Sequence, residues 1–253
     1  MKPAVTDDLW RRARTTTPAR IGLGRAGDAL PTARVMELNA ARAAARDAVH
    51  VPLDVETLRV DLEATGLGRP VLASSRAADR TEYLRRPDLG RLPGDLSAVR
   101  PSVPDVGLVL ADGLSPRAVN THGPAMVRAL IRELQPGFSI APPVIASQAR
   151  VALGDHIAAA MWATTVILLI GERPGLSVTD SVGIYLTHLP RTNSNDADRN
   201  CISNIRPPDG LGYQEAAALA ARLLVESHRV GRSGVLVKDT RAAALPGDRP
   251  QIR

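Results

Sequence analysis

The pattern of apolar and polar positions changes near residue 104. Before that point, Ala-rich segments are separated by passages rich in Pro, Gly and Arg. Beyond it, short apolar runs alternate with longer Ala- and Leu-rich segments. Short apolar runs bounded by Gly and Pro are typical of buried strands. The runs that predict strands are 106–110, 143–146, 165–170, 183–188 and 234–238.

The longer segments between these runs predict helices. Pro31 and Thr32 supply a start signal for the first clear one. Strands that alternate with helices of this length are typical of βαβ units. The sequence therefore predicts an α/β fold with a Rossmann-like, mainly parallel sheet flanked by helices and an N-terminal helical region. The predicted helices are 31–49, a stretch within 52–104, and 115–134, 155–162 and 214–230.

The same pattern suggests a division into two parts. Residues 84–105 are rich in Pro, Gly and Arg and favour loops and short turns. We therefore expect residues 1–104 to form an N-terminal helical region and linker that contacts a partner. Residues 105–253 are expected to form the α/β domain.

Composition narrows the possible functions. The net charge is +6 and the isoelectric point about 10.3, a balance that a nucleic-acid-binding module would share. Arg residues, however, are scattered among Asp and Glu, and aromatic residues make up only 2%. Binding of single-stranded nucleic acid usually needs aromatic side chains for base stacking. We therefore interpret the charge as a mixed, solvated surface and expect no nucleic acid partner.

Cysteine content and hydropathy bear on the compartment. A single cysteine excludes an internal disulfide, which fits the reducing cytosol. The first residues show no apolar stretch typical of a secretory signal, and the run at 164–170 is too short to span a bilayer. We expect a cytoplasmic protein without a membrane partner.

A GxGxxG pattern occurs at Gly22, Gly24 and Gly27, and Asp47 follows at the spacing of a dinucleotide site. The alternative function is thus a nucleotide-binding oxidoreductase. That fingerprint requires a strand before the glycines and a long helix directly after them. The preceding residues are polar and contain Pro18, and Pro31 delays the helix. We interpret the pattern as a glycine-rich loop.

Polar residues follow two of the predicted strands. Glu172 and Arg173 come after the run at 165–170, and Asp112 and Gly113 follow the run at 106–110. Ligands of open α/β sheets bind outside the carboxyl ends of the strands. These loops are expected to meet at one crevice, although an ordinary surface pair between Glu172 and Arg173 is an equally weighted alternative.

Cys201 is open to three interpretations. It lies among short polar residues, and no histidine stands in a recognisable hydrolase context, so a nucleophilic role is disfavoured. It can be a small buried apolar residue or a non-nucleophilic residue that faces a ligand. His, Cys and carboxylate spacings match no metal site, so we expect no protein-bound metal.

Six segments, taken in this order, resemble the small subunits of ethanolamine ammonia-lyase over residues 19–238. GERPGL and NCISNIRP carry most of the specificity, because neither is a general fold signature. The segments are ARIGLGRAGDALPT, ARAAARDAVHVPLD, LVLADGLS, RVALGD, VILLIGERPGL and RNCISNIRP.

The resemblance implies a function that needs a second chain. The family binds adenosylcobalamin between the α/β domain of the small subunit and the TIM barrel of the large subunit, for radical conversion of ethanolamine to acetaldehyde and ammonia. The small subunit bears no catalytic residue. Its cofactor-binding residues fall here on Val151, Glu172 and Cys201. The resemblance also suggests a hexamer of heterodimers, located in the cytoplasm or in a bacterial microcompartment.

Overall fold

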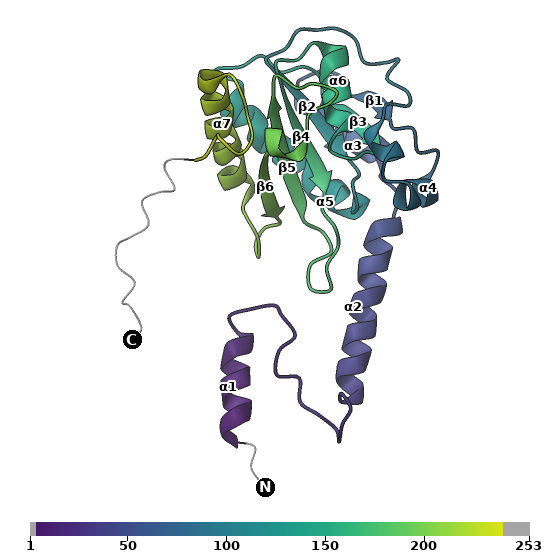
Figure 1. The fold of residues 1–253 in the computed structure, drawn as a ribbon, viewed down its shortest axis with the longest axis vertical. Helices are drawn as coiled ribbons and strands as arrows, with labels where there is room; N and C mark the ends of the chain where they lie inside the picture. The colour runs from purple at the N-terminus through teal and green to yellow at the C-terminus, as the bar shows by residue number, and fades with distance from the viewer. Residues whose placement is uncertain (1–3, 240–253) are drawn as a thin grey trace, which may run out of the picture.

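The computed structural model describes residues 4–239 and shows a central sheet with helices on both faces (Figure 1). The sheet has six strands in the order β1-β3-β2-β4-β5-β6. Long apolar runs form its centre, because β2 and β4 are buried over their whole lengths. The strands are β1 (Val71–Ser74), β2 (Val106–Ala111), β3 (Val144–Ser147), β4 (Thr165–Gly171), β5 (Val182–His188) and β6 (Asn200–Ile205).

The prediction of a mainly parallel sheet is only partly right, because the sheet is mixed. Strands β1, β3, β2 and β4 are parallel, whereas β5 is antiparallel to β4 and β6 is antiparallel to β5. A parallel neighbour requires a crossover of about a dozen residues or more, usually through a helix. Residues 172–181 and 189–199 contain no α-helix, so each connection returns the chain as a hairpin.

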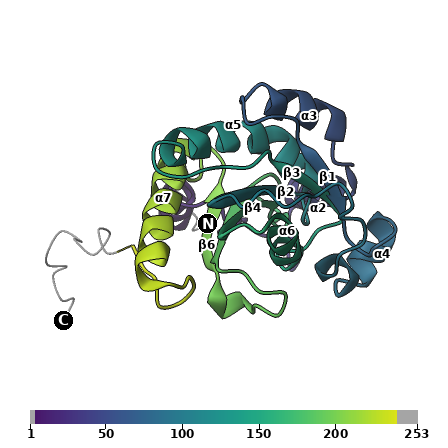
Figure 2. The same cartoon turned by 90° about the horizontal axis from the view of Figure 1, so that it is seen from above.

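The helices cover the two sheet faces unequally (Figure 2). On one face, α3, α5 and α7 build a core against the sheet. On the other, α6 makes its main packing contacts with β2 and β4. The α-helices are α1 (Ala4–Arg14), α2 (Thr32–His50), α3 (Val55–Glu63), α4 (Arg80–Arg85), α5 (Pro116–Leu134), α6 (Leu153–Met161) and α7 (Tyr213–Val230).

Helix boundaries follow capping signals. Ser115 accepts a hydrogen bond from the amide of Ala118 and begins α5, and Asp54 accepts one from the amide of Thr57 and begins α3. Helix α7 ends at Gly231, whose left-handed φ of 73° terminates a helix without steric penalty in glycine. The helices predicted at 31–49, 115–134, 155–162 and 214–230 are confirmed as α2, α5, α6 and α7.

Two strands were missed and one predicted strand is wrong. β1 lies within the range expected to be helix and linker, and β6 lies in the polar segment around Cys201. Residues 234–238 form no strand. Their backbone instead bonds the Asn200 side chain, which donates to the carbonyls of Gly234 and Val237 and accepts from the amide of Gly234. Residues 240–253 of the expected α/β domain lie outside the described residues.

The N-terminal part forms an arm outside the α/β layers (Figure 1). Helix α2 contacts α5 near its carboxyl end and projects away from the sheet, and α1 lies in the same arm, away from the sheet. Ala48 is the single buried residue of α2. Among the described helices, none is long and apolar enough to cross a membrane.

Candidate functional site

The side chain of Glu172 is held at the carboxyl end of β4 by a set of hydrogen-bond donors. The hydroxyl of Ser181 donates to Oε2 at 2.6 Å and the hydroxyl of Ser203 donates to Oε1 at 2.5 Å. The amide of Asn204 lies 3.2 Å from both oxygens. The three donors make four contacts with a carboxylate that offers about four acceptor positions, and the amide of Asn204 divides its one hydrogen between the two long contacts.

Local backbone geometry brings these donors to Glu172. Asn204 has a left-handed φ of 59°, a conformation that asparagine tolerates better than most residues. The register of β5 and β6 shifts at this end, and such irregularities re-aim groups at sheet edges. Gly183 leaves room as well, because a Cβ there would lie 3.0 Å from Oε1 of Glu172.

Cys201 lies on the same side of the sheet as α6, but over β5 and β6, where α6 does not extend. It is exposed and stands opposite Tyr185 in the antiparallel pair. Ser203 lies on the same side of β6, whereas Ile202 points into the opposite core. We call the surface formed by Tyr185, Cys201 and Ser203 the open face, because among the described residues no helix packs over it.

The two titratable groups of the open face, the Cys201 thiol and the Tyr185 hydroxyl, both have raised pKa values. Loss of hydration raises the pKa of the Cys201 thiol. A hydrogen bond from Tyr185 lowers this pKa in part, and the nearby negative charge of Glu172 raises it further. Burial, together with the Cys201 and Glu172 neighbours, raises the pKa of Tyr185 to about 12. A protonated thiol is a poor nucleophile. The nucleophilic interpretation of Cys201 is therefore unsupported, and a ligand-facing neutral thiol fits the geometry.

Val151 borders the open face from the side of α6. It precedes the first turn of α6 and packs, half-buried, against the same core as Tyr185. Val151 and Tyr185 line a hollow of about 300 Å³, to which Arg91, Arg150 and Asp196 also contribute. Tyr185 therefore lies between Val151 and the pair of Cys201 and Glu172, and the four residues form one continuous surface.

The prediction that Asp112 and Glu172 meet at one crevice is wrong. Gly171 and the 113–115 loop pack backbone against backbone, with the amide of Leu114 donating to Gly171. The two loops are therefore in direct backbone contact at this point. Glu172 turns toward β6, whereas Asp112 is buried and accepts hydrogen bonds from the amides of Gln148 and Ala149. Asp112 thus holds the loop that leads to Val151.

The glycine-rich pattern is confirmed as a loop. Gly22, Gly24 and Gly27 all have left-handed φ values and lie between α1 and α2, with no strand before them. The geometry of a dinucleotide site is therefore not met here. Within residues 4–239, no three His, Cys, Asp or Glu side chains are grouped so that they could hold a metal ion.

Comparison with known proteins identifies the family. The profile described as "Ethanolamine ammonia-lyase light chain (EutC)" matches residues 7–238. The ethanolamine ammonia-lyase small subunit of Rhodococcus erythropolis is 61% identical over 236 residues, which covers 93% of this chain and 92% of the relative. The chain belongs to the ethanolamine ammonia-lyase light-chain family. The resemblance seen in the motifs is thereby confirmed.

More distant light chains match over the same extent. The small subunit of Ralstonia nicotianae is 46% identical over 251 residues, covering 96% of this chain and 92% of the relative. That of Xanthomonas campestris is 47% identical over 249 residues, covering 95% and 91%. Membership in the ethanolamine ammonia-lyase light-chain family makes the chain part of a lyase and disfavours the oxidoreductase and nucleic-acid alternatives.

Sequence reasoning about this light chain missed residues that only the fold brings to the site. Tyr185 was noted only as part of a strand, and Ser203 and Asn204 only as part of a polar segment. A partial signal existed, because the alternation of Cys201, Ile202 and Ser203 is that of a strand with one polar face. The position of β6 beside β5 could not be inferred from it.

Proposed function

We propose that this chain, together with the large subunit of ethanolamine ammonia-lyase, holds adenosylcobalamin against the open face. When bound, the cofactor supplies the radical chemistry that converts ethanolamine to acetaldehyde and ammonia. We assign no catalytic role to the chain's own residues, which bind and orient the cofactor and exclude water from it. The observation that carries the proposal is that Val151, Glu172 and Cys201, far apart in sequence, border one continuous surface.

The open face suits a broad, flat ligand rimmed by amides. Two strands present the half-buried ring of Tyr185 and the small, exposed side chains of Cys201 and Ser203 there, and among the described residues no helix covers them. The corrin carries neutral carboxamides around its edge. Their N–H groups are donors that can compete at Glu172 with the long, divided contact of the Asn204 amide. A charge-assisted hydrogen bond of this kind is stronger than a neutral one.

The other two residues contribute shape. Val151 and Cys201 are compact, so the backbone near each can approach the macrocycle closely. Tyr185 between them offers a ring face, and its hydroxyl oxygen can still accept a hydrogen bond. Packing of these side chains against the cofactor removes apolar surface from water, which favours binding.

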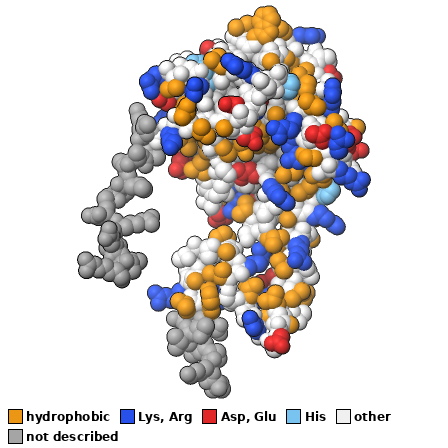
Figure 3. All heavy atoms as spheres, in the orientation of Figure 1, with side chains coloured by type: hydrophobic (Ala, Val, Ile, Leu, Met, Phe, Trp, Pro, Cys, Tyr) orange, Lys and Arg blue, Asp and Glu red, His pale blue; other side chains and the backbone are white. Residues whose placement is uncertain are grey.

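We further propose that the N-terminal arm is part of the contact with the large subunit. Leu9, Met36 and Val35 are exposed on α1 and α2, at 62%, 67% and 39% respectively. Figure 3 shows hydrophobic side chains interspersed with basic ones over this arm. Apolar groups exposed on a projecting element are typical of an interaction site.

The finer assignments made from the sequence and from the resemblance remain proposals. They are the TIM-barrel architecture of the large subunit, a hexamer of heterodimers, a cytoplasmic or microcompartment location, and the Rossmann-like description of the sheet. The division at residue 104 also remains a prediction, with β1 as a segment from the N-terminal part that completes the sheet.

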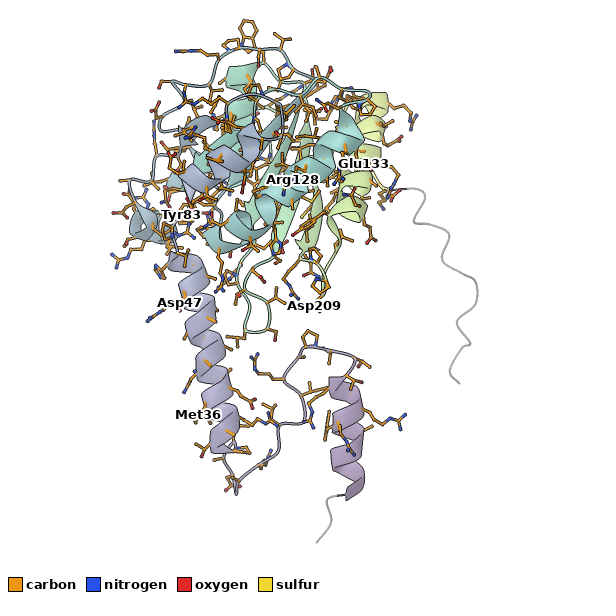
Figure 4. The ribbon with its side chains drawn as sticks, turned by 180° about the vertical axis from the view of Figure 1, so that it is seen from behind. Met36, Asp47, Tyr83, Arg128, Glu133 and Asp209 are labelled. Atoms are coloured by element: carbon orange, nitrogen blue, oxygen red, sulfur yellow. The ribbon has the colours of Figure 1, made fainter. Side chains whose placement is uncertain are left out.

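Substitution of Glu172 tests the proposal. In the assembled complex, we expect Glu172→Ala to raise the Kd for cyanocobalamin about tenfold through loss of a charge-assisted hydrogen bond. Equilibrium dialysis gives the Kd, and thermal unfolding gives the stability. Glu133→Gln is the matched control, because Glu133 is exposed on α5 (Figure 4). An unchanged Kd combined with a collapsed Tm would show that Glu172 serves only the fold.

A further inference from the structure

The hollow beside Val151 contains two arginines without acidic partners. Arg91 and Arg150 both line it, and neither forms an ion pair or a side-chain hydrogen bond with the described residues. Nε of Arg150 is buried and has no hydrogen-bond partner. A buried donor of a charged group left unsatisfied is costly, so an orphan of this kind calls for a ligand.

The guanidinium of Arg150 is held in place by packing. Its Cζ lies 4.6 Å from the ring centre of Tyr83, and that ring is completely buried. Arg80 stacks on the same ring at 4.8 Å, but it is engaged with Asp112 and with the carbonyls of Val49 and Gly113. Figure 4 places Tyr83 at the edge of the α/β layers, near the end of α2. The guanidinium of Arg150 is therefore fixed in position, and it lines the hollow without an acidic partner among the described residues.

The loop that carries Arg91 is tied to Arg150. The amide of Arg150 donates to the carbonyl of Gly90 at 2.9 Å. A Cβ at Gly90 would meet Tyr83 at 2.8 Å and Arg150 at 2.9 Å, so only glycine allows this approach. The two guanidinium groups are thus brought to one hollow by tertiary packing.

The one acidic residue of the hollow is shared with a third arginine. Asp196 lies 3.8 Å from Nε of Arg199, on the connection between β5 and β6. The hollow therefore keeps an excess of positive charge. Two convergent arginines suit the planar, charge-assisted recognition of a phosphate group.

We propose that Arg150 and Arg91 bind the phosphodiester of the cofactor's nucleotide tail. The assignment rests on the proposed function and adds to it a subsite for the one anionic group of the cofactor. The hollow adjoins Val151 and Tyr185, so a ligand that lies on the open face reaches it without leaving the surface. The two arginines orient the tail and thereby the corrin above Cys201 and Glu172.

Comparison of two corrinoids tests this subsite. Cyanocobalamin carries the nucleotide tail, whereas dicyanocobinamide lacks both the nucleotide and its phosphodiester. In the complex with the large subunit, we expect Arg150→Gln to raise the Kd for cyanocobalamin about tenfold or more and Arg91→Gln to raise it by a smaller factor. Both variants should bind dicyanocobinamide as the unsubstituted complex does. Absorbance after equilibrium dialysis measures both constants.

Controls separate the subsite from folding and from the proposed function. Arg132→Gln removes an exposed arginine of α5 and should leave both constants unchanged. Equal losses for both corrinoids, or weaker assembly with the large subunit, would assign the arginines to the protein scaffold or to a partner carboxylate and overturn the subsite. Unchanged cyanocobalamin binding in both variants would overturn it as well. Failure of the unsubstituted complex to bind cyanocobalamin would instead overturn the proposed function.

Discussion

The two halves of the sheet differ in what covers them. β2 and β4, the covered half, are buried over their full lengths between α5 on one face and α6 on the other. β5 and β6, the open half, are covered by helices on one face, where α7 packs against both strands and α5 also contacts β5. The covered half is therefore a support whose residues are chosen for packing. The open half combines an apolar side with a polar side that can contact a ligand.

The difference has its origin in the chain connections. Crossovers through α5 and α6 produce parallel strands and place a helix on each face. The two hairpins that follow add strands without adding a helix to the α6 side. Addition of antiparallel strands to a parallel sheet thus produces an uncovered face directly beside a rigid core. A site on such a face is both accessible and well positioned.

The largest effect is expected from a side chain added inside the covered half. In Gly171→Val, the new Cβ would overlap the carbonyl oxygen of Ser115 and approach that of Asp112. Both contacts are with backbone atoms, which cannot move aside as a flexible side chain can. We expect a loss of more than about 5 kcal/mol of unfolding free energy, seen as insoluble or unfolded protein.

The open half provides the control for that prediction. Cys201→Ala removes an exposed side chain and should change the unfolding free energy by less than about 0.5 kcal/mol in urea titration. If Cys201→Ala were as damaging as Gly171→Val, the distinction between the two halves would be wrong.

A smaller but still large effect is expected where the two halves are joined. Arg199, just before β6, forms a fully buried ion pair with Asp155 of α6, at 2.7 and 2.8 Å. It also donates to the hydroxyl of Thr187 and the carbonyl of Ser194. Arg199→Met leaves the Asp155 carboxylate buried without its partner, and we expect a loss of about 3–5 kcal/mol in denaturant titration.

Two further variants sharpen the test of this ion pair. Adding Asp155→Leu to Arg199→Met removes the stranded charge and should recover most of the loss. Arg229→Met breaks an exposed pair with Glu226 and should cost less than about 1 kcal/mol. Equal costs for Arg199→Met and Arg229→Met would mean that the buried pair does not join the halves.

The smallest effect is expected from pH. Burial lowers the pKa of His122, against the opposing charge of Asp180, and lowers that of His188, to which His228 adds. The unfolded chain therefore takes up protons first as pH falls. The contribution of both residues to the unfolding free energy is therefore complete above about pH 6.5. It declines as the pH falls from there through the lowered pKa values of the folded protein.

Urea midpoints between pH 7.5 and 5.5 measure this decline. His188→Gln should reduce the change of the urea midpoint with pH. His50→Gln, at an exposed position, should leave that change as it is in the unsubstituted protein. A midpoint that rises on acidification would contradict the direction of the lowered pKa values.

The sequence alone determined most of the elements and the family. Long apolar runs such as β4 and capped helices such as α5 carry their structure in local patterns, because burial on both faces and N-capping leave clear signals. The motifs around Glu172 and Cys201 carried the resemblance. The predicted strand at 234–238 was wrong because its backbone bonds the Asn200 side chain in place of a neighbouring strand.

Only the tertiary structure decided how the site is assembled. Asp112 and Glu172 occupy equivalent places after parallel strands, yet backbone packing at Gly171 separates them and turns Glu172 toward Ser203. The pairing of Tyr185 with Cys201 depends on the register of the hairpin between β5 and β6, which local patterns do not specify. Likewise, the approach of Arg91 to Arg150 depends on glycine packing between distant segments. Contacts of long sequence separation follow from how the layers pack, and no single segment encodes them.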